Sequence, residues 1–301
     1  MTTATRMNIS AGIASVSVAL VLVALKIWAL GETHALSVAA SLADSAMDLM
    51  VSLGGLAAIA YAARPADDDH TYGHTSAEDL AALGQSLFIL VSAGVIGWAA
   101  IARLLAADPE ALNHQGRGMV VMAVSIGLTA ALVLWQRRVA RRTGSRVVKA
   151  DSLHYLGDLI PNLGAILSLW ASAAFGLGQI DSVVALGAAV MLAVGAIRIF
   201  KGAWDALMDR AAPNEVVADI ERIVATWPGV YGHHDLKTRM AGSKTFVTVH
   251  VELDGRKTLD ETHATAAALR RALLAAVPGS DVMIHQDPKG VTPHPDDPSR
   301  N

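Results

Sequence analysis

The chain has 301 residues, of which 53% are hydrophobic and 17% charged, and its 24 basic side chains nearly balance its 27 acidic ones. The charged fraction is below the roughly 25% of soluble domains, and the charge balance gives no indication of nucleic-acid binding. Cysteine is absent, which excludes disulfide bonds and thiolate metal sites, whereas the 11 histidines allow metal sites of imidazole and carboxylate.

The first two thirds of the chain consist of apolar stretches that we interpret as membrane helices. A helix needs about 20 apolar residues to cross a bilayer. In chain order, the six candidate stretches cover residues 9–30, 35–62, 80–105, 118–136, 152–175 and 180–200. The first is longer than the core of a signal peptide and no small-residue cleavage site follows it, so we interpret it as a retained helix.

Basic residues predict the orientation of these helices. They are concentrated in the connection RRVARRTGSRVVK after the fourth stretch, and Arg64, Lys201 and Arg210 follow the second and sixth stretches. The connections GETH and GLGQ contain no Lys or Arg. Because Lys and Arg stay on the cytoplasmic side, we expect both termini to be cytoplasmic.

Two apolar stretches contain charged pairs at helical spacing. Asp44 and Asp48 are four residues apart, and so are His154 and Asp158. This spacing places the two members of a pair on one helix face, with their Cβ atoms about 5–6 Å apart. Acids inside a bilayer are costly and indicate a function. We expect the two helices to supply four ligands to one ion; the alternative is a structural network in which the acids bond to Ser41, Ser45 or Ser52.

The ligand types narrow the choice of metal. One imidazole and three carboxylates suit Zn²⁺ and tolerate Cd²⁺, Co²⁺ or Fe²⁺, whereas an all-oxygen site would favour Mn²⁺ or Mg²⁺. Metal ligands must be deprotonated, so loading the site releases protons and protonation releases the metal. The pattern therefore predicts metal/proton exchange.

A second candidate metal site lies in the loop RPADDDHTYGHTSAED, between the second and third stretches. His70 and His74 are four residues apart, with Asp67, Asp68 and Asp69 beside them. Pro65 and Gly73 indicate a loop, so no helix imposes this spacing. The segment is either a surface metal site at the cytoplasmic entrance or a solvated acidic loop.

The last third of the chain predicts a small α+β domain. We place the boundary at residues 208–215 and expect a membrane domain over 1–208, a cytoplasmic domain over 209–290 and a disordered tail over 291–301. The expected elements are a helix at 214–225, strands at 232–242 and 244–255, an amphipathic helix at 259–277 and a strand at 281–287. This αββαβ order indicates an open sheet with helices on one face.

Histidines gather in this domain. Alternation along the second strand places Val247, Val249 and Val251 toward the core and His250 on the other face. His285 and Asp287 share one face of the last strand, and His234 and His263 are further candidates; His233 would point away from His234. A binuclear metal site is the favoured interpretation, and unrelated surface histidines are the alternative. His34 and His114 are interpreted as surface residues.

Several motifs carry a family resemblance. SLADSAMDL, DDDHTYGH followed by AED, ADSLHYLGD, HDLKTR and IHQDP occur along the chain. With six helices and a tail domain, they resemble the cation diffusion facilitator family, most closely its bacterial zinc and ferrous-iron efflux branch. The resemblance covers nearly the whole chain.

The resemblance implies a role for each candidate residue. It implies a transport site of Asp44, Asp48, His154 and Asp158, and a loop site of Asp67, His70 and His74. It implies a cytoplasmic binuclear site, which bridges a homodimer, of His234, His250, His263, His285 and Asp287. It also implies a ferredoxin-like tail domain and a bacterial inner-membrane location. Ser76 stands where relatives carry a lysine that pairs with an acid, here Asp209; another cation such as Arg210 could replace it.

We therefore expect a homodimeric secondary transporter in the lipid bilayer, not an enzyme, that exports Zn²⁺, and also Cd²⁺ or Fe²⁺, in exchange for protons. A membrane metallohydrolase is one alternative, although the HExxH pattern is absent. A metal sensor that does not transport is another, and metal flux would distinguish it.

Overall fold

The structure is a computed structural model that describes residues 3–33, 36–105, 116–175, 180–242 and 244–290. The chain divides into two compact units, Met1–Trp204 and Asp205–Asn301. His34, His114 and the expected disordered tail at 291–301 lie outside the described residues. The boundaries of the three expected domains remain predictions.

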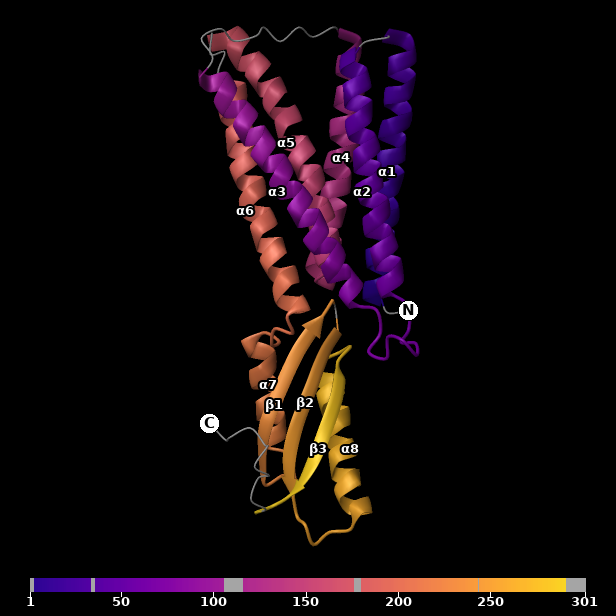
Figure 1. The fold of residues 1–301 in the computed structure, drawn as a ribbon, viewed down its shortest axis with the longest axis vertical. Helices are drawn as coiled ribbons and strands as arrows, with labels where there is room; N and C mark the ends of the chain where they lie inside the picture. Colours follow the sequence, from indigo (N-terminus) through magenta and orange to yellow (C-terminus); the bar gives the residue numbers. More distant parts are fainter. Residues whose placement is uncertain (1–2, 34–35, 106–115, 176–179, 243, 291–301) are drawn as a thin grey trace. The chain divides into compact units, whose positions relative to one another are not determined.

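Six long helices run side by side in the first unit (Figure 1). They are α1 (Thr3–Thr33), α2 (Leu36–Ala62), α3 (Ser76–Leu105), α4 (Gly116–Thr143), α5 (Arg146–Phe175) and α6 (Ile180–Leu207). Each predicted stretch coincides with one helix, but α4 continues past residue 136 to Thr143 and α5 begins at Arg146 rather than at residue 152. Arg and Lys are good helix formers, so a helix continues beyond its apolar part.

Four of these helices contain spans long and apolar enough to cross a membrane, namely Thr3–Trp28, Ser45–Ala62, Ser76–Leu105 and Ala185–Leu207. Parts of α4 and α5 lie outside the residues whose side chains are described. The number of six membrane spans therefore remains a prediction.

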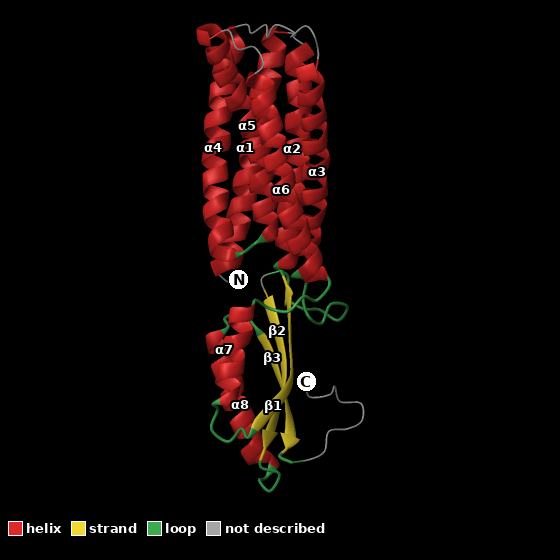
Figure 2. Cartoon of the chain, turned by 90° about the vertical axis from the view of Figure 1, so that its left-hand side faces the viewer, coloured by secondary structure: helices red, strands yellow, loops and turns green. Residues whose placement is uncertain are grey.

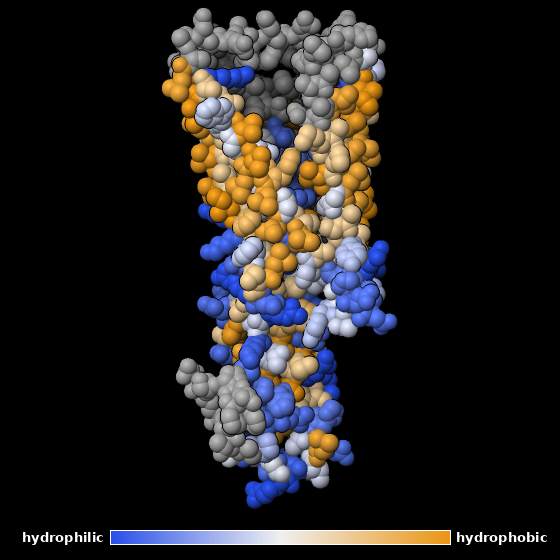
Figure 3. Space-filling view, viewed as in Figure 1, coloured by the Kyte–Doolittle hydropathy of each residue, from blue (hydrophilic) through white to orange (hydrophobic). Residues whose placement is uncertain are grey.

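Small and aliphatic side chains join the helices. Ala11 of α1, Ile59 of α2 and Val139 of α4 form one buried cluster with Val147 and Val148 of α5. A second cluster packs α3 against α6 through Ile89, Ala93, Leu192 and Ala196. Many large apolar side chains point outward, such as Trp98 and Leu134, which are 75% and 68% exposed. Figure 3 shows a largely apolar surface over the helices, which suits contact with lipid rather than water.

The second unit has the expected αββαβ order. Its elements are α7 (Asn214–Ala225), β1 (Gly232–Ala241), β2 (Lys244–Leu253), α8 (Leu259–Ala276) and β3 (Asp281–Pro288). The sheet order is β1-β2-β3, with β1 antiparallel and β3 parallel to β2. Both helices cover one face of the sheet (Figure 2). The predicted α+β fold of this unit is confirmed.

The core of this unit lies between the sheet and its helices. Val247, Val249 and Val251 of β2 are at most 2% exposed and pack against Ile220 of α7 and Leu269 of α8. The predicted alternation along β2 is therefore confirmed. Its consequence is that His250 lies on the face of the sheet that the helices leave uncovered.

Candidate metal centres

The membrane unit brings together Asp48 of α2 with His154 and Asp158 of α5. The His154 Nε2 and Asp48 Oδ1 atoms are 3.0 Å apart, and one ligand atom from each of the three residues lies within 4.8 Å of the others. His154 is 8% exposed. Asp44 occupies α2 one turn before Asp48, and its side chain is outside the described set. One imidazole nitrogen and two carboxylates thus converge on a site that can accept a divalent cation.

The serines near this cluster have other partners. Ser45 Oγ accepts a hydrogen bond from Lys26 Nζ at 2.6 Å. Ser52 Oγ lies 2.8 Å from both Ser15 Oγ and the Tyr155 hydroxyl. In these contacts Ser45 and Ser52 bond to partners other than Asp48. The Ser41 and Asp44 side chains are outside the described residues, so the serine-acid network remains an alternative.

Lys26 was not among the candidate residues. It lies on α1, within an apolar stretch, and its ammonium group meets α2 at Ser45, which is 1% exposed and three residues before Asp48. A cation inside a membrane helix is itself an indication of function. Sequence alone showed the charge but not that it reaches the helix of the acids.

The loop between α2 and α3 joins its three candidate residues through one carboxylate. Asp67 Oδ1 lies 3.2 Å from His70 Nδ1, and Asp67 Oδ2 lies 3.1 Å from His74 Nε2. The backbone amide of His70 also donates to Asp67 Oδ1 at 2.7 Å, and this bond, with the two imidazoles, holds the pKa of Asp67 below its usual value.

The position of His74 is restricted by its surroundings. It is 5% exposed, its Nδ1 lies 3.1 Å from the carbonyl oxygen of Pro65, and its ring meets that of Tyr61 edge to face at 4.7 Å. The Pro65 contact favours a proton on Nδ1, which leaves Nε2 to face Asp67 or a metal. Asp68 and Asp69 are exposed.

The tail unit gathers its candidates on the open face of the sheet. His234 pairs with His250 across β1 and β2, and His250 pairs with His285 across β2 and β3. Asp287 Oδ2 lies 3.1 Å from His250 Nδ1 and 3.5 Å from His234 Nε2. These three residues form a group whose ligand atoms lie within 4.8 Å of one another.

His285 contacts the other carboxylate oxygen of Asp287. Its Nε2 lies 3.3 Å from Asp287 Oδ1, the oxygen that does not face His250, and its ring centroid is 4.4 Å from that of His250. Asp287 can therefore serve two neighbouring ions, one through each oxygen.

His263 does not join this group within one chain. It is an exposed residue of α8, and α8 packs on the opposite face of the sheet. The resemblance implies a binuclear site that bridges a homodimer, and the part that His263 plays in it remains a prediction.

Two further acids lie near the tail cluster and were missed from the sequence. Asp235 Oδ2 is 3.8 Å from His250 Nε2, and Glu252 Oε1 is 4.0 Å from His234 Nδ1. Asp235 reaches this face because the register of β1 shifts between His234 and Lys237, where Asp235 has φ of 48°. Strict alternation would have placed it on the other face.

Asp209 forms an ion pair with a residue of the same compact unit. Asp209 accepts a hydrogen bond from Arg239 Nη1 of β1 at 3.1 Å. Arg210, the substitute cation considered from the sequence, is instead paired with Asp205. The segment after α6 is therefore fastened to the tail sheet by Arg239.

Two family models and several curated pumps match most of the chain. The family model described as the cation efflux transmembrane domain matches residues 12–208, and that of the cation efflux protein cytoplasmic domain matches residues 212–289. Cation-efflux pumps named FieF from Klebsiella pneumoniae and from an Escherichia coli strain are 41% identical over 283 residues, which cover 94% of this chain and 93% of theirs. One from Yersinia enterocolitica is 40% identical over 284 residues, or 94% of each chain.

A solved structure resembles the tail unit. The metal-bound C-terminal domain of the CzcD transporter from Thermotoga maritima is 26% identical and covers 26% of this chain and 93% of its own. Its TM-score is 0.25.

Proposed function

This chain belongs to the cation efflux, or cation diffusion facilitator, family of membrane transporters, and on that premise we propose that it exports Zn²⁺ in exchange for protons. Cd²⁺ and Fe²⁺ are further proposed substrates. The observation that carries the proposal is the group formed by Asp48, His154 and Asp158 inside the helical unit. Asp44 is the proposed fourth ligand.

The ligand set supports a transported ion. Zinc binds His nitrogen and carboxylate oxygen at about 2.0–2.2 Å in a tetrahedral arrangement, which four such ligands can complete. Two acids and an imidazole gathered between membrane helices are costly unless a cation or protons compensate them. A site that alternates between metal and protons meets this requirement in both states.

Proton exchange follows from the same chemistry. The metal needs deprotonated carboxylates and a neutral imidazole, so an ion that binds from the cytoplasm displaces protons. On the outer side, protonation of His154 and the acids would release the ion. Helix movement would expose the site first to one side and then to the other.

The tail unit is proposed to bind metal and to stabilise a homodimer. Asp287 can bridge one ion held by His234 and His250 and a second held by His285. His263 of a second chain would complete the second ion's ligands. The family model that matches this unit is described as a cytoplasmic domain. We propose that the protein lies in the inner membrane of a bacterium, with both termini in the cytoplasm.

The loop group of Asp67, His70 and His74 is proposed as a surface metal site at the cytoplasmic entrance. Its three ligand atoms already lie within 4.8 Å of one another without a helix to impose their spacing. Nothing in this proposal requires the loop to be part of the transport step.

The test is metal-driven proton movement in sealed proteoliposomes that contain a pH-sensitive dye. Zn²⁺, Cd²⁺, Fe²⁺ and Mn²⁺ are added in turn to the parent protein and to Asp48→Ala. Asp219→Ala is the matched control, because Asp219 is an exposed acid of α7 paired with Arg222. We expect proton movement with Zn²⁺ in the parent and the control and its loss in Asp48→Ala. Tight zinc binding without flux in correctly inserted protein would overturn transport and favour a sensor.

A further inference from the structure

One buried carboxyl group of α5 takes no part in the metal groups. Asp151 is 6% exposed and precedes His154 by three residues. Its Oδ2 accepts a hydrogen bond at 2.6 Å from Gln136 Nε2 of α4. Its Oδ1 is buried and has no donor at ordinary hydrogen-bond geometry among the described residues, although the Ser15 hydroxyl of α1 lies close enough to stabilise the carboxylate. A buried acid oxygen without a donor is uncommon and calls for an explanation.

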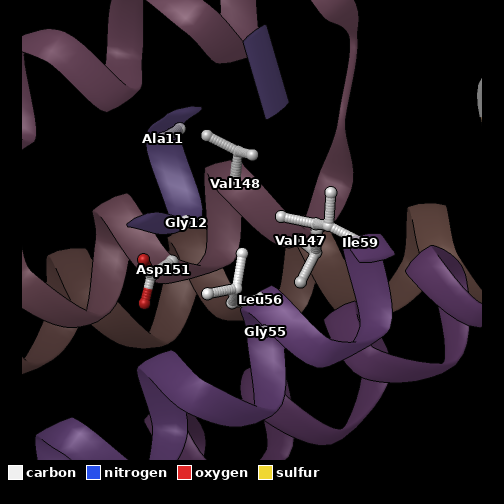
Figure 4. Close-up of a pocket in the computed structure, with 8 residues that line it drawn as sticks. All are labelled: Ala11, Gly12, Gly55, Leu56, Ile59, Val147, Val148 and Asp151. Atoms are coloured by element: carbon white, nitrogen blue, oxygen red, sulfur yellow. The ribbon is translucent and has the colours of Figure 1, made fainter. Parts of the chain in front are cut away.

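A small pocket lies beside this carboxyl group, between α1, α2 and α5 (Figure 4). Asp151 is the one residue with a polar side chain among the eight that line it; the others are glycine, alanine and aliphatic residues, including Gly12, Leu56 and Val148. Its volume is about 10 Å³, close to the roughly 10–15 Å³ that one water needs. The pocket therefore has room for about one water, and the Asp151 carboxylate is the one polar side chain that could hold it there.

A row of hydroxyl groups runs from the neighbourhood of Asp151 to residues that lie close in sequence to the metal ligands. The Ser15 side chain of α1 lies near Asp151 and its Oγ is 2.8 Å from Ser52 Oγ, which is 2.8 Å from the Tyr155 hydroxyl. Ser52 lies one turn after Asp48 on α2, and Tyr155 follows His154. Each hydroxyl both donates and accepts, so the row can reorient as charge changes at either end.

The charges around Asp151 favour exchange of a proton. The titratable groups that face it are His154 and Tyr155 on α5 and Asp48 on α2, whereas the described residues of α1 and α4 next to it offer the uncharged Ser15 and Gln136. An ionised carboxylate whose neighbours on α1 and α4, Ser15 and Gln136, are uncharged is costly in such a site. A divalent ion on Asp48 and His154 would offset that cost, and its departure would restore it.

We propose that Asp151 is a proton-binding group of the exchange reaction, separate from the metal ligands. When the ion leaves, Asp151 Oδ1 takes a proton from a hydronium ion in the pocket, which yields a neutral carboxylic acid and water. When an ion binds, the O–H bond breaks, the proton returns to water and the carboxylate is restored. No other bond changes. This inference rests on the metal/proton exchange proposed above and adds one group to it.

The test compares Asp151→Asn with the parent protein in sealed proteoliposomes. Zinc entry and proton movement are recorded together, which gives the number of protons per metal, and the measurement is repeated across a range of pH. Glu78→Gln is the matched control, because Glu78 is also a buried acid of the bundle but both of its oxygens accept hydrogen bonds, from Asn8 and Ser145. We expect Asp151→Asn to move fewer protons per zinc and to show a flatter pH profile, and the control to match the parent.

An Asp151→Asn protein with the parent's proton count and pH profile would overturn the inference while leaving proton exchange intact. A parent that moves zinc without protons would instead overturn the proposed exchange itself. If Asp151→Asn carries no flux, infrared difference spectra at two pH values show whether the Asp151 carboxyl group gains and loses a proton. A carboxylic-acid C=O band that zinc removes in the parent and that Asp151→Asn lacks supports the inference, and the same band in both proteins refutes it.

Discussion

His154 Nε2 lies 3.0 Å from Asp48 Oδ1, although 106 residues separate the two in the chain. The contact joins α5 to α2 inside the helical unit and brings one nitrogen into a site otherwise made of carboxylate oxygens. In the proposed transporter, this nitrogen is the feature that distinguishes a zinc site from a site for harder cations.

Replacing that nitrogen should change the preferred metal. His154→Asp turns the ligand set into oxygens alone, which favour Mn²⁺ over Zn²⁺. We expect the ratio of zinc to manganese transport to fall by at least about tenfold, the lower end of the range seen when even an indirect partner of a metal is removed. Competition between the two ions in proteoliposomes measures the ratio, and an unchanged ratio would remove His154 from the site.

The membrane group could be predicted because its physical signature is local. Two pairs of polar residues at a spacing of four, each inside an apolar stretch, can be recognised without a structure. The ends of the helices could not be predicted in this way. The helix α5 begins at Arg146, and its first turns are helical but not apolar. The pocket beside the Asp151 side chain could not be predicted either. It is formed together with α1 and α2, and the spacing of Asp151 from His154 gives no sign of it.

In the tail unit, alternation predicted the faces of β2 correctly and those of β1 only in part. His234 and His250 meet as expected, but the register shift after His234 also brings Asp235 to within 3.8 Å of His250. No residue in HHDLKTR marks that shift. His263 was a candidate from the sequence, but α8 carries it on the other side of the sheet from the histidine cluster.

A buried ion pair fastens the helices at one end of the bundle. Asp79 of α3 is 1% exposed and pairs with Arg146 at the start of α5. Breaking a buried pair leaves one charge without compensation and costs about 3–5 kcal/mol. We therefore expect Asp79→Asn to lower the unfolding temperature in detergent strongly, and adding Arg146→Gln to restore part of the loss.

The exposed pair of Asp219 and Arg222 is the control for this prediction. Both side chains are more than half exposed, so Asp219→Asn should change stability by no more than about 1 kcal/mol. Equal effects of Asp79→Asn and Asp219→Asn would mean that the Asp79 pair contributes no more than a surface contact.

The start of α8 should depend on pH. Thr258 and Glu261 form a capping box, and the backbone amide of Thr258 lowers the pKa of Glu261 below its usual value. Because the folded pKa is depressed, this contribution is complete above the unfolded value of about 4.3 and is lost as pH falls through the folded value. The hydrogen-exchange protection factors of the first-turn amides of α8, which compare each rate with the intrinsic rate at the same pH, should therefore fall below about pH 4.

A variant separates the cap from other effects of acid. Thr258→Ala removes the side-chain acceptor of the Glu261 amide and should cost about 1 kcal/mol. Its first turn should exchange faster at neutral pH and respond less to acid than the parent. An acid response equal to the parent's would show that some group other than the capping box titrates there.

Removal of the metal should destabilise the tail unit, and the effect should depend on the sheet face that carries His250. An ion that binds only the folded state stabilises it by about 2.7 kcal/mol at one hundred times its dissociation constant. Chelation should therefore speed hydrogen exchange in β2 and β3 of the full-length protein, and His250→Ala should abolish this dependence on zinc. His233→Ala is the matched control, because His233 pairs with Val251 in the register and therefore lies on the other face from His250. If His233→Ala removes the dependence on zinc and His250→Ala does not, the metal lies on the helix-covered side and the proposed tail site is wrong.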